Sequence, residues 1–304
     1  MRISLNMMHS QVLDGLMSDA DKLSEAQNRA STGKQILKPS DDPMGAARAM
    51  NLRSSLSQLD QMSRNTSAVK NQLGLTDNAL KTIASQLSTV RRLAVQAGNA
   101  ALSTPERNAI LVQLDEVSTQ LVNAGNVQYD GKYILAGNET RTAPIAKNPG
   151  GAPPYAYNGD TGTQSVYIAP GITIASNITG DKVFNMGGSA DPNTPDVFKM
   201  IADLKENILN DNTDAVSKSI SSIDTNLTNV NAIRTQVGAR INRIDDTANQ
   251  LADTKLNMKS MLSDTEDVDL AQAITDVQVR TNAYQAAIAT AQKVFSLSLS
   301  DYLK

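Results

Sequence analysis

The sequence predicts a mainly α-helical chain with a small β insertion, in which two long helices pair antiparallel as a coiled-coil rod. Two observations favour this fold class. Apolar residues recur every three to four positions over two stretches of similar length, and proline and glycine gather in the segment between them. Large rigid side chains are scarce, with no tryptophan, three phenylalanines and seven tyrosines among 304 residues. Aliphatic side chains must therefore supply most of the buried surface.

The two long helices are predicted by apolar stripes that repeat about every 3.5 residues. The first stripe runs from Leu52 to Ala97 and the second from Val216 to Leu262. At 1.5 Å per residue each helix would be roughly 70 Å long. Neither stripe is stable in water, and the chain must return between them, so we expect the helices to pair antiparallel. Arg234 and Lys255 interrupt the second stripe. They either fix the helix register or extend their stems to the edge of the rod.

A third, shorter helix is predicted from Ser103, which starts a Ser-x-x-Glu capping box with proline inside the first turn. Its apolar stripe continues to Ala124, and we expect it to fold back along the first long helix. Thr194 followed by Pro195 offers a similar start for a helix after the middle segment.

The middle segment, residues 138–195, has a different composition from the helical parts. It holds seven of the ten prolines and eight of the seventeen glycines, which rule out a long helix. Residues 165–169 and 172–174 are predicted to be strands because they are β-branched or aromatic runs bounded by glycine and proline. We expect a small β-rich domain at the tip of the rod.

Both ends of the sequence carry amphipathic helical stripes, and we expect no further domain beyond them. We divide the chain into terminal helices (1–42 and 264–304), a helical rod (43–137 and 196–263) and the β-rich tip domain (138–195). The stripes of the terminal helices form the expected assembly interface. Its candidate residues are Leu5, Met8, Val12, Leu16, Leu23, Ile274, Val277, Tyr284, Ile288, Phe295 and Tyr302.

The expected turn between the first terminal helix and the rod contains Pro39, Asp41, Asp42 and Pro43. The residue before each proline is disfavoured in a helix, and aspartate followed by proline is a common helix start. Two neighbouring aspartates could also serve acid–base chemistry or bind a cation. Turn formation and helix capping already account for both aspartates, and we favour that interpretation.

The sequence does not predict an enzyme, a cofactor or a metal site. His9 is the only histidine and there is no cysteine, which excludes a pair of histidine metal ligands and nucleophilic triads that need histidine. Residues 125–132 have one spacer too many for a phosphate-binding loop and lack its serine or threonine. The net charge of −3, with both signs interspersed, favours neither a nucleic-acid nor a membrane partner. No stretch of roughly eighteen apolar residues is present, and the N-terminus lacks the apolar core of a cleaved signal peptide.

Several segments of the sequence resemble the flagellin superfamily. Residues 31–47 read Ser-Thr-Gly-Lys-Gln-Ile-Leu-Lys-Pro-Ser-Asp-Asp-Pro-Met-Gly-Ala-Ala and are similar to the motif that follows the first helix in that family. The opening Met-Arg-Ile-Ser and residues 90–97 and 295–303 support the resemblance. The Pro-Ser-Asp-Asp-Pro form and residues 129–140 are more similar to the branch that forms the hook–filament junction than to the flagellins.

The resemblance implies an extracellular structural subunit of the bacterial flagellum, located at the hook–filament junction. Its implied partners are copies of itself in a ring, the adjoining hook-associated junction protein, flagellin, and a cytoplasmic export chaperone at the C-terminal helix. The resemblance further implies export by the flagellar type III apparatus, and terminal helices that form the inner tube and are disordered in the free subunit. Two alternatives stay open: a flagellin, or a secreted adhesin that is displayed on the tip domain.

Overall fold

The computed structural model describes residues 5–99, 102–149, 151, 153–187 and 194–302. Its helices are α1 (Leu5–Thr32), α2 (Pro43–Ala97), α3 (Thr104–Gly125), α4 (Gly180–Phe184), α5 (Val197–Leu209), α6 (Thr213–Glu266) and α7 (Leu270–Tyr302). The strands are short and antiparallel, so the prediction of a mainly α fold with a small β insertion is confirmed. The contacts divide the chain into a larger unit, residues 59–252, and a terminal unit, residues 1–58 with 253–304.

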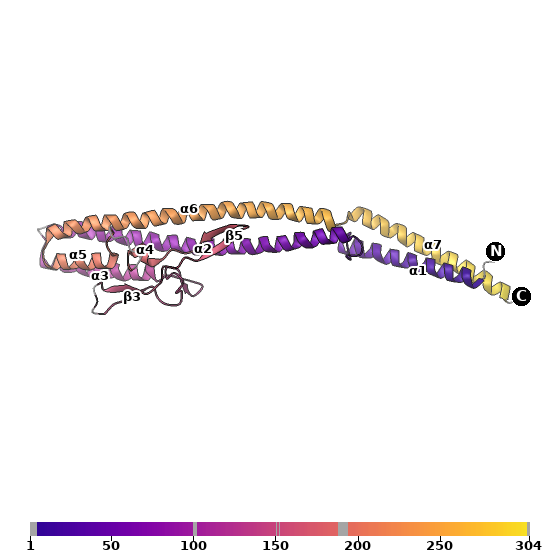
Figure 1. Cartoon of the computed structure of the whole chain (residues 1–304), viewed down its shortest axis with the longest axis horizontal. Coiled ribbons are helices and arrows are strands. Elements are labelled where there is room, and N and C mark those ends of the chain that lie inside the picture. The colour runs from indigo at the N-terminus through magenta and orange to yellow at the C-terminus, as the bar shows by residue number, and fades with distance from the viewer. Residues whose placement is uncertain (1–4, 100–101, 150, 152, 188–193, 303–304) are drawn as a thin grey trace. The chain divides into compact units, whose positions relative to one another are not determined.

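Within the larger unit, α2 and α6 run antiparallel and side by side (Figure 1). Three ion pairs show the antiparallel direction, because their residue numbers rise along α2 and fall along α6. The pairs are Lys70–Asp245 at 2.5 Å, Asp77–Arg234 at 3.2 Å and Arg91–Asp224 at 2.6 Å. The side chain of Arg234, whose role the sequence leaves open, therefore contacts the facing helix.

The predicted apolar stripes of these two helices form the core of the larger unit. Their buried members are Leu59, Val69, Leu73, Leu80, Ile83, Leu87 and Val90 on α2, and Val216, Ile223, Val230, Val237, Ile244 and Leu251 on α6. Two threonines interrupt the stripe of α2 and are also buried. The hydroxyl of Thr76 donates to the carbonyl of Gln72 at 2.9 Å, and that of Thr66 lies 2.7 Å from the carbonyl of Met62. Each threonine is thus satisfied within its own helix.

α3 and α5 complete the helical packing beside α2 and α6. The predicted capping box begins α3, where the backbone N–H of Ser103 donates to the Glu106 carboxylate at 2.8 Å. The hydroxyl of Ser103 and this backbone bond lower the pKa of Glu106. The predicted start of α5 at Thr194 was two residues early. Asp196 caps this helix instead, accepting from the N–H groups of Phe198 and Lys199 at 2.7 and 2.9 Å.

The β segment consists of three separate two-stranded hairpins. The paired strands are β1 (Gln128–Tyr129) with β2 (Lys132–Tyr133), β3 (Ile145–Lys147) with β4 (Tyr155–Tyr157), and β5 (Ser165–Ala169) with β6 (Ile172–Ala175). The strands predicted over 165–169 and 172–174 are confirmed. Residues 125–132 hold the end of α3, β1 and a tight turn at Asp130 and Gly131, which both have positive φ.

These hairpins lie against the helices, whereas the sequence placed them in a domain at the tip of the rod. Asn65 of α2 donates to the carbonyl of Tyr167 at 3.1 Å, and Arg240 of α6 donates to the carbonyl of Asn177 at 3.2 Å. A two-stranded hairpin buries too little to be stable alone, so each hairpin packs on a helical surface. The aromatic rings of Phe184 and Phe198 stack at 5.4 Å within this shared core.

Two glycines provide a matched test of this packing. A Cβ on Gly125 would meet Ile145 Cδ1 and lie 3.1 Å from the ring of Phe184, whereas a Cβ on Gly74 would meet nothing within 4 Å. We expect Gly125→Ala to lower the free energy of unfolding by about 1–3 kcal/mol through overpacking. Gly74→Ala should raise it by up to about 1 kcal/mol through helix propensity. Urea denaturation of the purified variants measures both changes, and a stabilised Gly125→Ala variant would contradict the packing described.

Candidate functional site

The terminal unit holds every residue of the predicted assembly interface and of the predicted turn. Its main feature is the pairing of α1 with α7, whose Cα atoms approach within 8 Å (Figure 1). The unit also contains the first part of α2 and the last part of α6. Segments from the two ends of the sequence therefore form one compact body.

The structure divides the predicted interface residues into three groups. Val12, Leu16, Leu23, Val277, Tyr284 and Ile288 are half-buried, on the facing sides of α1 and α7. Met8 and Ile274 are exposed, the latter by 64%. The side chains of Leu5, Phe295 and Tyr302 lie outside the described residues. Six of the eleven predicted interface residues are thus partly covered within the subunit.

Alanines that the sequence analysis passed over occupy the most buried positions of this helix pair. Ala273 and Ala291 of α7 are 5% and 7% exposed. Both share a helix face with Val277 and Ile288, because residues three or four apart lie on the same side. Small side chains allow the close helix approach. Ala273 lies four residues before Val277, so helical spacing could have placed it on the buried face. The adjacent and larger Ile274 was assigned to that face instead.

The terminal unit leaves most of its large apolar side chains uncovered. Among the described residues, fifteen large apolar side chains are exposed, and eleven of them belong to this unit. They are Met7, Met8, Leu13, Met17, Met44, Met50, Leu256, Met261, Leu270, Ile274 and Val279. Its buried apolar side chains are only alanines among the described positions: Ala49, Ala273 and Ala291. The unit therefore has apolar surface for contacts but little core of its own.

The predicted turn is organised by its two aspartates, which have different tasks. Asp41 accepts from the backbone N–H groups of Lys38 and Leu37 at 2.9 and 3.2 Å. These bonds hold the pKa of Asp41 below its usual range, and the bond from Lys38 has the largest effect. Asp42 Oδ1 accepts from the N–H groups of Met44 and Gly45 at 3.1 and 2.9 Å, which caps α2.

Pro39 is exposed within the same turn, and Pro43 is the first residue of α2. Proline has no N–H to satisfy, and its fixed φ suits the first position of a helix. Local turn and cap chemistry therefore uses both aspartates and both prolines. Asp269 caps α7 as Asp42 caps α2, because it accepts from the N–H of Ala271 at 2.9 Å.

The joint between the terminal helices and α2 and α6 contains a residue that the sequence analysis did not select. Glu266, the last residue of α6, is 7% exposed. Its two carboxylate oxygens pair with Lys34 at 2.9 Å and Arg53 at 2.5 Å. Burial acts to raise the pKa of Glu266, but the hydrogen bonds from Arg53 and Lys34 outweigh burial and lower it. The carboxylate is therefore held in its charged form.

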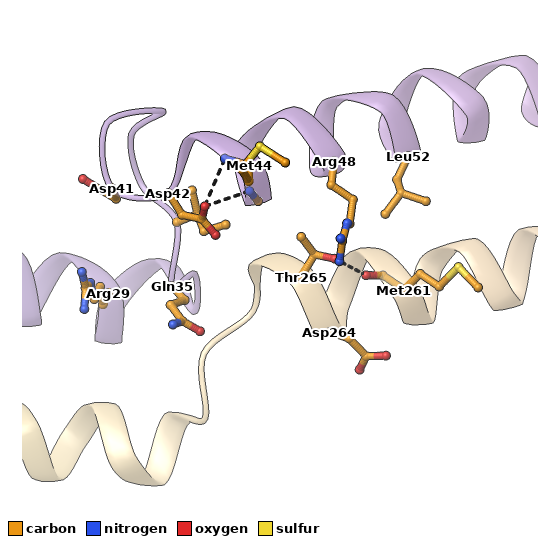
Figure 2. Close-up of a pocket in the computed structure, with 12 residues that line it drawn as sticks. Arg29, Gln35, Asp41, Asp42, Met44, Arg48, Leu52, Met261, Asp264 and Thr265 are labelled. Carbon is orange, nitrogen blue, oxygen red and sulfur yellow. Dashed lines mark hydrogen bonds between the residues drawn. The ribbon is translucent and has the colours of Figure 1, made fainter.

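Beside this joint lies an open hollow of 790 Å³ (Figure 2). Met44 and Met261 line it and are 80% and 57% exposed. Arg48 extends from α2 toward the end of α6, where the hydroxyl of Thr265 donates to the carbonyl of Met261 at 2.7 Å. The hollow is lined by mixed charges and methionine and holds no cluster of metal-ligating side chains. Across the described chain, no group of three or more histidine, aspartate or glutamate side chains could hold a metal ion. None of the described helices is long and apolar enough to span a bilayer.

Comparison with known protein families gives two matches that together take in more than two thirds of the chain. Residues 3–140 match the bacterial flagellin N-terminal helical region. Residues 220–303 match the bacterial flagellin C-terminal helical region. The first match includes α1, α2, α3 and the turn with Lys34 and Arg53, and the second includes Glu266 and α7.

Individual proteins resemble the whole chain. Flagellar hook-associated protein 3 of Salmonella typhimurium is 27% identical over 317 residues, which covers 98% of each chain. The protein of the same name from Escherichia coli is also 27% identical, over 98% of each chain. The crystal structure of the flagellar junction protein from Legionella pneumophila has a similar fold. It matches with a TM-score of 0.59 and 16% identity over 73% of this chain and all of that one.

The cap at Asp42 can be tested by a single substitution. Asp42→Ala should destabilise the start of α2 by about 1 kcal/mol, because two backbone N–H groups lose their acceptor. Asp264→Ala is the matched control, because this exposed aspartate makes no ion pair within the described residues. Hydrogen exchange of the first turns of α2 measures the effect. Equal exchange rates in both variants would contradict the capping role.

The charged state of Glu266 predicts how the terminal unit responds to acid. A carboxylate whose pKa is lowered in the folded state adds its full stability at pH values above its ordinary pKa, which is 4.5 for glutamate. That stability is lost as the pH falls through the lower pKa of the folded state. Circular dichroism of the parent should therefore show helix loss below about pH 4.5. Glu266→Gln should show less pH dependence over this range. A variant curve that superimposes on the parent's would refute the prediction.

Proposed function

Because the chain belongs to the flagellin superfamily, we propose that it is a structural subunit of the bacterial flagellum at the junction between hook and filament. The full-length likeness to hook-associated protein 3 supports this location. A structural role also agrees with the chemistry of the turn, where the two aspartates accept hydrogen bonds from backbone N–H groups. The proposed protein is thus a building block and not an enzyme.

The uncovered apolar surface of the terminal unit is the observation that carries the assembly role. Each large apolar side chain that is removed from water contributes about 1.5–3 kcal/mol. Among the described residues, the larger unit exposes four large apolar side chains, whereas the smaller terminal unit exposes eleven. Neighbouring copies that cover these side chains would stabilise α1 and α7. Contacts that repeat from one copy to the next generate a ring or a helical array.

The predicted interface residues serve this assembly in two ways under the proposal. The half-buried set on the facing sides of α1 and α7 holds the terminal helices together within one subunit. The exposed set, which includes Met8 and Ile274, contacts neighbouring subunits. Leu5, Phe295 and Tyr302 extend the same stripes toward the chain ends. With its faces uncovered the terminal unit is marginal, and we expect the terminal helices to be disordered in the free subunit until neighbouring copies cover them.

The proposal includes the partners and the location that the family resemblance implies. The subunit forms a ring of its own copies between the adjoining hook-associated junction protein and flagellin, outside the cell. It reaches that place through the flagellar type III apparatus, after a cytoplasmic chaperone has bound its C-terminal helix. The apolar surface of α7 is a suitable surface for such a chaperone, because Leu270, Ile274 and Val279 are exposed.

Deletion of the gene tests the junction role directly. Electron microscopy should show hooks without filaments, with flagellin released into the medium. Normal filaments in the deletion strain would reject the proposal. The flagellin alternative is tested with the purified protein, which would then polymerise into long filaments instead of forming a short ring on hooks.

Substitutions on the exposed face of α1 test the assembly surface. Leu13→Gln with Met17→Gln removes two exposed apolar side chains, and we expect loss of incorporation and motility with unchanged folding of the larger unit. Val112→Gln with Leu209→Gln is the matched control, because these side chains are at least as exposed but belong to the larger unit. Immunoblots of isolated hooks measure incorporation. Equal incorporation of both double variants would contradict the predicted surface.

Removal of residues 265–304 is the complementary test. The truncation removes α7 and the end of α6 but no residue of the larger unit. We expect cooperative thermal unfolding of the remaining helices, together with complete loss of incorporation. Circular dichroism measures the first outcome, and cooperative loss of the larger unit's helices on truncation would contradict the separation of folding from assembly.

A further inference from the structure

We propose that Glu266 is a positioning residue, whose ion pairs hold the α1–α7 helix pair in one orientation relative to the adjoining ends of α2 and α6. The inference rests on the proposed function, because this orientation decides how the terminal helices meet neighbouring subunits. All of these segments belong to the terminal unit. The argument starts from the contacts of one carboxylate.

Glu266 connects three segments that are far apart in the sequence. Lys34 follows directly after α1, Arg53 lies on α2, and Glu266 ends α6. Each carboxylate oxygen takes one cation, Oε1 from Lys34 and Oε2 from Arg53. The Glu266 side chain is only 9% exposed, so water screens these pairs less than surface pairs. One side chain therefore ties the exit of α1 to both long helices.

The backbone beside Glu266 adds a second connection. The N–H of Gln35 donates to the carbonyl of Glu266 at 2.7 Å, and the N–H of Val268 donates to the carbonyl of Gly33 at 2.9 Å. Lys34 and Asp267 thereby form an isolated antiparallel bridge. Gly33 has a φ of +69°, which a residue with a side chain adopts only with strain. The segment that links α1 to α2 is thus hydrogen-bonded to the segment that links α6 to α7.

Side-chain packing cannot supply the same restraint at this joint. The buried apolar side chains of the described terminal unit are alanines, and the hollow beside the turn is open. A bridge of one residue pair allows bending, since so short a ladder is only marginally stable. The ion pairs to Glu266 add a contact to α2 that the bridge does not make. The orientation of the terminal helices therefore depends on this polar contact.

The absence of cysteine from the sequence makes a direct distance measurement simple. Asn28→Cys on α1 and Ser54→Cys on α2 place two spin labels at exposed positions next to the joint. Pulsed electron paramagnetic resonance on full-length subunits incorporated onto isolated hooks, with labelled copies diluted among unlabelled ones, should give one narrow distance distribution. Glu266→Gln should broaden the distribution and remove its single maximum.

Two further variants keep the test decisive if Glu266→Gln disturbs folding. Lys34→Gln with Arg53→Gln removes the cations and leaves Glu266 in place, and it should broaden the distribution in the same way. Asp264→Asn makes the same charge change two positions away and should leave the parent distribution intact. Circular dichroism confirms equal helix content. An unchanged distribution in Glu266→Gln, or a broad one in the parent, would overturn the proposal.

Incorporation onto hooks then tests the consequence for assembly. Glu266→Gln should be incorporated less than Asp264→Asn, and equal incorporation would show that the orientation is not needed. A Glu266→Gln subunit that is incorporated and keeps the parent distance distribution would refute the positioning role alone. Failure of the positioning role is therefore distinguishable from failure of the proposed function, which the deletion strain reports.

Discussion

Burial of aliphatic side chains between α2 and α6 is the constraint on which the larger unit depends. Leu80 and Ile83 on one helix and Val230 and Val237 on the other are fully buried, and ion pairs at the surface link the two helices. The terminal unit follows a different rule. Its buried apolar positions hold alanine, whose burial contributes far less than that of leucine or isoleucine. Its remaining apolar surface faces outward and is available to neighbouring subunits.

Much of the helical structure could be predicted because it depends on local patterns. The stripes from Leu52 to Ala97 and from Val216 to Leu262 follow helical periodicity, and the capping box at Ser103 is a local signal. Thr66 and Thr76 did not disrupt the stripe of α2, since each hydroxyl returns to its own helix. The hairpins were less predictable. Their strand sequences are local, but their position along α2 and α6 depends on side chains such as Asn65 and Arg240.

The same distinction holds for the candidate site. Asp41 and Asp42 bond to backbone groups within a few residues, so their turn chemistry follows from the sequence. Glu266 could not be selected in this way, because its partner Arg53 lies 213 positions away. In the sequence it appears only as one acid within an acidic segment. Long-range ion pairs of this kind require the fold before they can be recognised.

The pairing of the first described helix with the last one has a consequence for the order of folding. Gly33 and Val268, which are bonded to each other, are more than two hundred positions apart in the chain. Closing a loop of that length costs conformational entropy before any contact compensates for it. Once α2 and α6 have paired, the ends of that loop are already neighbours, and the remaining cost is small. The α1–α7 pair should therefore fold last and open first, which leaves it the most adaptable part of the chain during its incorporation.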